Sequence, residues 1–488
     1  MRALIATPLR RLAWSCGAFF LLASVAAWFT SQSDAAPLTD GDMMKRYLVM
    51  PFLFVLMIFS LLSACAIKPV TKGDVATATP AQPTRPYMAQ VVGVQWLNPL
   101  QRRDYSTEWQ LLWTLGLAKP NQNDDKVREN PARFSKVQSI GMIASGNDGE
   151  ETFKGYHHKY VDELTLLFRQ SYFANGSYFY NAHSLKDKST RRELAGIHIE
   201  YALPAGRLDP VEAGNFVRDN ISDTFSIGNP HFPNSWTTAT PPDVRVTMGG
   251  ANAGFTSLAA GLAYLQAHPD KTVWVMNWDA PSFPPKDEQI DENIALLILA
   301  GPDFKTQRAP LAWLGFPATA AVADYQAAKG QPPRAVQAWT AAIEQAAEQA
   351  NLDTDKIAYV IHDAGNRYPA SSERIGSLGQ SLTLNLPDLD FTKQTFNTSA
   401  LLGEMGAGTA LTNVALAVAY ANHQGRPVLV AGTGDLEAPV AVLVAPPAVA
   451  RPIDPEKPWF RARGEASVFL PWWGLRHDAK TLMQGYSN

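Results

Sequence analysis

The strongest constraint on the fold is a regular alternation of short apolar runs with helical patterns between residues 244 and 445. Strands that alternate with helices indicate an α/β sheet. The expected strands are 244–248, 272–278, 294–300, 357–362, 427–432 and 440–445, and the expected helices are 253–267, 333–351 and 407–422. Earlier in the chain we expect strands at 88–97, 137–144 and 195–203 and helices at 106–117 and 160–173.

The alternation contains an internal repeat. In both copies a glycine opens an alanine-rich helix, a tyrosine lies near the end of that helix, and a strand and an aspartate follow. The matching positions are Gly250 and Gly406, Tyr264 and Tyr420, and Asp279 and Asp435. Alanine and glycine on both helices favour their close packing, so the sequence predicts a duplicated α/β unit with two central Ala/Gly-rich helices.

Two uncharged apolar stretches stand at the beginning, at residues 12–29 and 47–67. Each approaches the length needed to span a bilayer. Three alternatives follow: a transmembrane hairpin, a lipoprotein signal that starts at Met43 or Met44 and ends at Cys65, or a secretory signal formed by the first stretch alone. We expect a bacterial inner-membrane anchor with a cytoplasmic domain; the alternative is a periplasmic domain with Cys65 lipidated.

The chain of 488 residues is long enough for more than one lobe. The expected organisation is a membrane anchor or signal region at 1–68, a linker at 69–87, an N-terminal α/β lobe at 88–240, a second lobe at 241–450 and an aromatic tail at 451–488. The net charge is −3 and no basic stripe is present, which argues against a nucleic-acid partner.

Both cysteines, Cys16 and Cys65, lie in the apolar stretches, and residues 66–488 contain none. This excludes a disulfide, a thiolate metal site and a cysteine nucleophile from the rest of the chain. Neither a Gly-x-Ser-x-Gly elbow nor a phosphate-binding Gly-Lys-Ser/Thr loop occurs. His157 and His158 near Asp162 and Glu163 allow a metal site, but a solvated loop is favoured. Asp279 and the acidic residues up to Glu292 are expected to form a solvated loop. We therefore expect no metal and no cofactor.

The duplicated unit resembles the thiolase and ketoacyl-synthase superfamily. Residues 246–254 (VTMGGANAG) resemble the turn that carries the nucleophilic cysteine, 352–365 the strand before the first catalytic histidine, and 403–408 (GEMGAG) the loop of the second. On this resemblance the cysteine position falls on Ala251 or Gly250, the first histidine on His362 and the second on Glu404. The resemblance implies a degenerate site without the family's reaction, and a possible homodimer.

Three further runs resemble the lipase-adaptor family of type VI secretion systems: 93–100 (GVQWLNPL), 141–151 (GMIASGNDGEE) and 274–285 (WVMNWDAPSFPP). This resemblance implies a non-catalytic adaptor that binds a phospholipase effector and helps to load it onto the secretion spike.

Two alternatives to the adaptor remain. One is an acyl-ligand sensor that keeps the substrate cleft of the thiolase-like superfamily for binding only. The other is a residual enzyme that uses His362 with Thr247 or Glu404. The aromatic tail, with Trp459, Trp472 and Trp473, either contacts a partner or folds back on the domain.

Overall fold

The computed structural model describes residues 86–97, 107–118, 152–173, 193–280, 292–306, 309–365 and 369–452. Both N-terminal apolar stretches, the strand expected at 137–144 and most of the C-terminal tail lie outside these ranges. Within them, no helix combines the length and the apolar character that a bilayer span requires.

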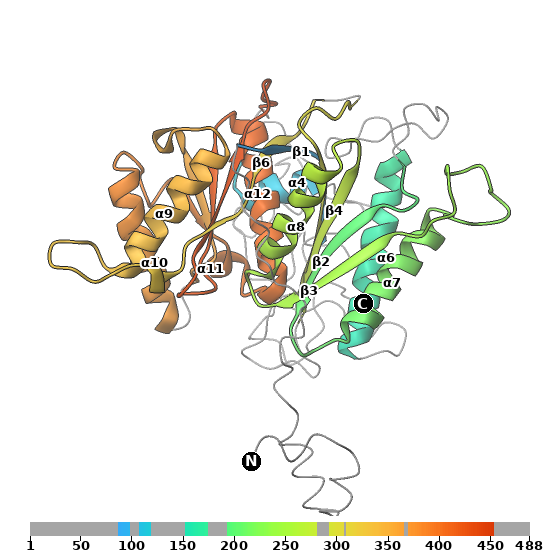
Figure 1. Ribbon diagram of the computed structural model, residues 1–488, viewed down its shortest axis with the longest axis horizontal. Coiled ribbons are helices and arrows are strands. Elements are labelled where there is room, and N and C mark those ends of the chain that lie inside the picture. Colours follow the sequence, from blue (N-terminus) through green and yellow to red (C-terminus); the bar gives the residue numbers. More distant parts are fainter. Residues whose placement is uncertain are drawn as a thin grey trace, which may run out of the picture. The chain divides into compact units, whose positions relative to one another are not determined.

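Five strands of the first half of the described chain form one half of the sheet (Figure 1). They are β1 (Met88–Leu97), β2 (His198–Pro204), β3 (Asp243–Gly249), β4 (Thr272–Asp279) and β5 (Asn293–Ala300). Their spatial order is β3-β2-β4-β5-β1. β2 pairs in parallel with β3 and β4, whereas β5 is antiparallel to both β4 and β1. β4 and β5 are buried along their whole length, as apolar runs of this kind predict.

The second half of the described chain repeats this order. Its strands are β6 (Ala312–Gly315), β7 (Ala318–Thr319), β8 (Tyr359–His362), β9 (Thr395–Asn397), β10 (Val428–Gly432) and β11 (Val440–Ala445). Their order is β9-β8-β10-β11-β6, with β7 also on β11, and β11 is the antiparallel strand. If the two-residue strand β7 is left out of the count, the order in both halves is third, second, fourth, fifth, first. The expected α/β class is confirmed, and the repeated order is what the sequence repeat predicts.

The halves meet where β1 pairs with β6. The change from one half to the other therefore falls between residues 300 and 312. β2 and β3, which lie on either side of residue 240, pair within the same half. The division into lobes at 88–240 and 241–450 remains a prediction about domains, since the repeat of strand order follows a different boundary.

Helices cover the sheet in layers. They are α4 (Thr107–Thr114), α6 (Phe153–Phe173), α7 (Pro210–Thr224), α8 (Ala253–Ala267), α9 (Arg334–Gln349), α10 (Pro369–Asn385), α11 (Thr398–Leu402) and α12 (Thr409–Gln424). Figure 1 shows α8 and α12 in the middle, α6 and α7 beyond the first half-sheet, and α9 and α10 beyond the second. Three apolar clusters separate these layers, one on each outer side and one around the central pair.

The central helices approach each other closely because small residues stand at their crossing. A Cβ atom on Gly254 of α8 would lie 2.8 Å from the Cβ atom of Ala410 in α12. Nearly the whole of α12 is buried, and it ends at Gly425 in the left-handed conformation, φ 66°. The close packing predicted for two alanine-rich helices is therefore observed.

The two tyrosines of the repeat occupy equivalent places. Tyr264 of α8 stacks on His198, the first residue of β2, at 4.1 Å between ring centroids. Tyr420 of α12 stacks on Tyr359, the first residue of β8, also at 4.1 Å. β2 and β8 hold the same place in the strand order of their halves, so the same helix position contacts the same strand position in each unit.

Several boundaries differ from those expected. α6 begins at Phe153 rather than near residue 160, and a short 3-10 turn, η6 (Gly406–Gly408), replaces the first turn expected for the helix at 407–422. The sequence reading missed α7, α10 and α11 and the strands β6, β7 and β9. α7 is mostly polar, and its buried side consists of small and β-branched residues.

Candidate functional site

His362 ends β8 and is buried, with 1% of its surface exposed. Its Nδ1 atom accepts a long hydrogen bond of 3.4 Å from the backbone N–H of Ala364. Burial lowers the pKa of His362 to about 4, so the ring is neutral at pH 7. A base with so low a pKa is a weak proton acceptor near neutral pH. The surroundings of His362 therefore favour a structural role.

Glu404 lies beside the loop that follows His362. A Cβ atom on Gly365, whose φ is +72°, would lie 3.0 Å from the Oε1 atom of Glu404 and 3.1 Å from Oγ of Ser371. Because Gly365 has no side chain, the Glu404 carboxylate can lie close to the backbone of this loop. Asn397 fixes the loop as well, since its side chain bonds to both the N–H and the C=O of Gly365, each at 3.0 Å.

Ala251 lies between β3 and α8, and it contacts the loop that follows β10. Its Cβ atom is 2.7 Å from where a Cβ atom on Gly434 would be. The adjacent Thr433 donates its N–H and its hydroxyl to Asp363, at 2.7 and 2.8 Å. The three predicted positions, Ala251, His362 and Glu404, thus surround the carboxyl ends of β8 and β10. Their assignment as a degenerate catalytic site stays a prediction, and position 251 carries no nucleophile.

A second polar cluster is centred on Asp279, the last residue of β4, which is 1% exposed. Its carboxylate accepts hydrogen bonds from the N–H of Ala407 at 2.9 Å, from Arg207 at 3.0 Å and from the N–H of Ala280 at 2.8 Å. Burial raises the pKa of Asp279 to about 6 despite these three donors. Because Ala407 belongs to the turn before α12, this carboxylate joins the two halves of the fold.

The solvated acidic loop expected around Asp279 is therefore wrong for the residues that the structure describes. Asp279 and Glu292 are both buried. The residues between them, 281–291, lie outside the described ranges. The cause is non-local: the start of α12, far away in the sequence, supplies the donor that stabilises the buried charge.

Around Asp279 the cluster continues into α6. Tyr201 of β2 is completely buried, and its hydroxyl lies 3.0 Å from Nε2 of His157. Burial and the nearby charge of Asp279 raise the pKa of Tyr201 well above its ordinary value, and burial lowers the pKa of His157 to about 3. The Arg207 guanidinium lies 3.6 Å from the ring centroid of Phe153. These contacts lock α6 onto the sheet.

Neither the solvated loop expected at His157 and His158 nor the alternative metal site fits this geometry. Both histidines lie on α6, and the His158 ring stacks on Phe216 at 3.7 Å between centroids. In the described part of the chain, no group of three or more His, Cys, Asp or Glu side chains has a geometry that would hold a metal ion.

Asn293 completes the junction of the two halves. It pairs with Asp279 across β4 and β5, and its side-chain NH₂ donates to the C=O of Gly408 at 3.1 Å and to the Thr412 hydroxyl at 2.9 Å. Gly408 is required at this approach, because a Cβ atom there would lie 2.6 Å from Oδ1 of Asn293. The hydrogen bonds of the Asp279 carboxylate and the Asn293 NH₂ group therefore link the first half of the fold to the start of α12 in the second.

The fold and these contacts define a duplicated α/β protein whose halves are joined through two central helices. Residues 311–446 match the family model described as the C-terminal region of the type VI lipase adapter protein Tla3. This match confirms the family resemblance predicted from the sequence. The matched segment runs from the residue before β6 to the residue after β11, which is the complete second half of the repeat.

Comparison with solved structures finds ketosynthases. A ketosynthase domain for oxazolomycin from Streptomyces albus JA3453 is 13% identical, covers 77% of this chain and 100% of its own, and has a TM-score of 0.45. The ketosynthase of module 6 of the bacillaene synthase from Bacillus subtilis 168 is 11% identical over 74% of this chain and 70% of its own, with a TM-score of 0.47. Among curated proteins, none matches the chain.

Proposed function

We propose that this protein is a non-catalytic adaptor that binds a phospholipase effector and helps to load it onto a type VI secretion spike. The observation that carries the proposal is the match of residues 311–446 to the C-terminal region of a type VI lipase adapter. Because the matched segment is one whole structural half, the likeness covers a complete packing unit rather than a short motif.

The chemistry at the candidate site supports a role in binding rather than catalysis. Condensing enzymes of the family that the sequence resembles use a thiolate held at a helix N-terminus. The chain has Ala251 at that position and no cysteine after Cys65. His362 is neutral and buried, and a carboxylate at Glu404 opposes the stabilisation of a developing oxyanion.

A secretion assay tests the proposal. The gene for this chain is deleted in a bacterium with an active type VI system, and the export of the phospholipase effector and of the spike protein is measured separately. We expect the effector to remain in the cell while the spike is still exported, with rescue by the full chain and by the His362→Gln variant. Normal effector export without the chain contradicts the proposal, and so does rescue that requires His362.

We also propose that residues 1–68 anchor the chain in the inner membrane with the folded part in the cytoplasm, where an effector waits before export. The support is the pair of apolar stretches with their flanking basic residues. Fractionation of the full chain, of a variant without residues 1–68 and of Cys65→Ser tests this. Recovery in the membrane only while Cys65 is intact would show a lipoprotein and contradict the cytoplasmic placement.

A further inference from the structure

Among the strands that the structure describes, β3 lies at one end of the sheet, and only β2 pairs with it. The hydrogen bonds to β2 show which residues face that side. The N–H of Asp243 donates to the C=O of Ile197, and the C=O of Gly249 accepts from Ala205. Because successive residues of a strand turn their N–H and C=O groups to opposite sides, Val244, Val246 and Met248 direct theirs away from β2. Such groups are a template for another strand.

The other end of the sheet differs. β9 has only three residues, Thr395–Asn397, whereas β3 has seven, Asp243–Gly249, in continuous register with β2. Short edge strands limit pairing with another chain, and long regular ones permit it. β3 is exposed or half-buried along its whole length, whereas the neighbouring β2 is buried throughout.

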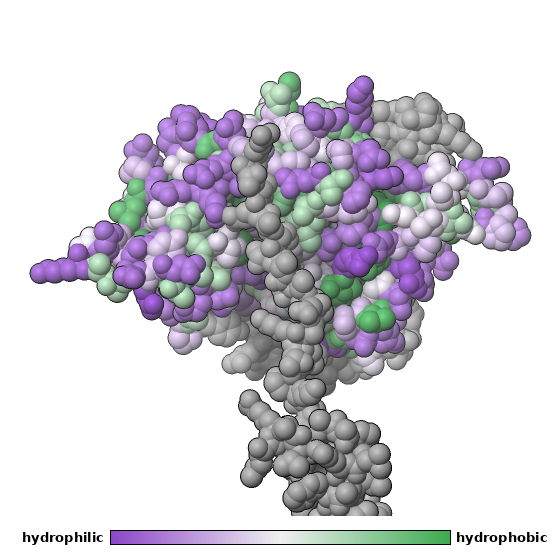
Figure 2. Space-filling view, viewed as in Figure 1, coloured by the Kyte–Doolittle hydropathy of each residue, from purple (hydrophilic) through white to green (hydrophobic). Residues whose placement is uncertain are grey.

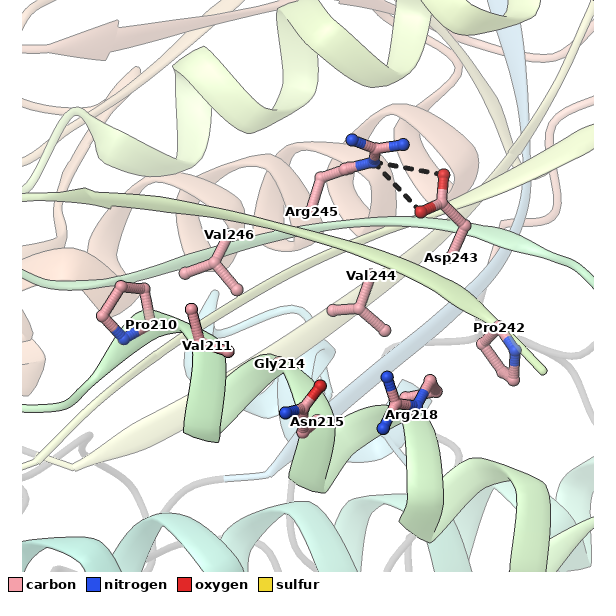
Figure 3. A pocket seen from close by; sticks show the side chains of 10 residues that line it. All are labelled: Pro210, Val211, Gly214, Asn215, Arg218, Pro242, Asp243, Val244, Arg245 and Val246. Atoms are coloured by element: carbon pink, nitrogen blue, oxygen red, sulfur yellow. Dashed lines mark hydrogen bonds and ion pairs between the residues drawn. The ribbon is translucent and has the colours of Figure 1, made fainter. Parts of the chain in front are cut away.

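A groove of about 420 Å³ runs beside this edge, between β3 and α7 (Figure 3). Val244 and Val246 point into the groove toward α7, and Val211 of α7, 69% exposed, lies at one end. α7 comes close because it has a glycine there: a Cβ atom on Gly214 would lie 3.2 Å from Cγ2 of Val246. In the same orientation as Figure 1, Figure 2 shows hydrophobic patches over the region of β3 and α7.

Arginines flank the edge on both faces of the strand. Arg218 of α7 lies at the end of the groove near Pro242, and Arg245 stands on the opposite face of β3 (Figure 3). Their side chains are 38% and 66% exposed, and each also contacts an aspartate, Asp219 and Asp243 respectively. The edge therefore offers backbone hydrogen bonds, an apolar strip toward α7 and cationic groups on both faces.

We propose that an extended segment of the phospholipase effector adds to the sheet as a strand beside β3. Its side chains toward α7 are small and apolar opposite Val211 and Val246, and it carries an acidic side chain near Arg218 or Arg245. Strand addition gives affinity through the backbone and selectivity through alternate side chains. This inference rests on the proposed adaptor function, because it names the surface through which the adaptor holds its effector.

Hydrogen–deuterium exchange with residue-level fragmentation tests it, on the full chain alone, with purified effector and with the spike protein. With effector bound, the exchange rates of the Val244, Val246 and Met248 amides should fall by a factor of roughly ten or more, as expected for newly bonded strand amides. Those of Arg245 and Thr247 should change little, because they already face β2.

Two variants and a matched control accompany the exchange measurement. Val211→Asp places a charge in the groove at the start of α7, where an acidic residue is tolerated by the helix. Val449→Asp makes the same change at a site that is 74% exposed and away from the groove. We expect Val211→Asp to weaken effector binding roughly tenfold or more, as at a central contact, and Val449→Asp to leave it unchanged. Val246→Pro removes one outward N–H and should act like Val211→Asp.

The possible failures are distinguishable. If the chain binds no effector at all, the adaptor function itself is wrong. If effector binds normally to Val211→Asp and the three amides stay unprotected, the effector binds elsewhere on the chain. Strand addition beside β3 is then wrong, while the adaptor function stands. If these amides are protected in the chain alone and its mass in solution is doubled, β3 pairs with a second copy of the chain and the inference is wrong. Protection of the same amides by the spike protein without effector would also overturn the inference.

Discussion

Replacing Gly254 by alanine should destabilise the protein, although the same change usually stabilises a helix. Alanine in a helix interior is favoured over glycine by about 1 kcal/mol. At Gly254 the new Cβ atom would lie 2.8 Å from Cβ of Ala410 and 3.3 Å from Cγ of Leu411, both in the buried helix α12. Overpacking of this kind costs about 1–3 kcal/mol. The net effect on the free energy of unfolding is thus a loss of up to about 2 kcal/mol.

Gly376→Ala is the matched control. Gly376 lies inside α10, and a Cβ atom there would meet nothing within 4 Å. This variant should gain up to about 1 kcal/mol, so it should be more stable than Gly254→Ala by about 1–3 kcal/mol, mainly because of the packing cost at Gly254. Urea unfolding followed by tryptophan fluorescence measures both.

A double-mutant cycle with Ala410→Gly identifies the contact. Ala410→Gly should lower stability in the wild-type background by more than it does in Gly254→Ala, because it removes the atom that the new methyl group meets. If Gly254→Ala stabilises the protein as much as Gly376→Ala, the close crossing of α8 and α12 is refuted.

Three further outcomes are expected. Burial raises the pKa of Asp279 in the folded state from 3.8 to about 6, so this group makes the free energy of unfolding fall as pH rises from about 4 to about 6. The fall is on the order of 1.4 kcal/mol per pKa unit, and the pH profile of unfolding free energy for Asp279→Asn should lack it. For His362 the sign is opposite: its folded-state pKa is lowered from 6.5 to about 4, so stability is lost as pH falls through this interval, and His362→Gln should lose less in acid titration. Asn293→Ala should cost about 1–3 kcal/mol in urea unfolding, because the Gly408 carbonyl and the Thr412 hydroxyl lose a buried donor, whereas a neutral effect would show that water replaces it.

The elements that could be predicted from sequence are those whose own residues determine their burial. The helix at 253–267 was predicted with the bounds that α8 has, and the strands around 272–279 and 293–300 were placed within a residue or two. Strands covered on both faces are apolar throughout, and α12 is alanine-rich because it lies between two half-sheets. The internal repeat can be recognised in the sequence because both of its copies contain such a buried strand and an alanine-rich central helix.

The missed helices had weaker signals. α7 is polar on most of its surface, yet its start carried a recognisable signal: Asp209 caps it by accepting from the N–H groups of Val211 and Glu212, and Pro210 follows. α10 contains Gly376 and Gly379 and several serines, which disfavour a helix locally. It forms because it packs on α9, a contact that its own sequence does not reveal.

The buried charge at Asp279 illustrates what a single sequence leaves open. The neighbouring acidic residues made a solvated loop the natural expectation. The carboxylate is instead buried because Ala407 and Arg207, each more than 70 residues away, donate to it. The loops that carry Ala251, His362 and Glu404 could be placed at strand ends and helix starts by pattern, while their mutual arrangement depends on the pairing of β8 with β10.

The central claim is that the protein binds a phospholipase effector without catalysis of its own. Size-exclusion chromatography of the purified full chain mixed with purified effector, with acyl-thioester turnover measured on the same fractions, tests it most directly. The account predicts a stable complex of chain and effector, and thioester turnover no higher than in buffer. The absence of a complex, together with thioester turnover that His362→Gln abolishes, would contradict it.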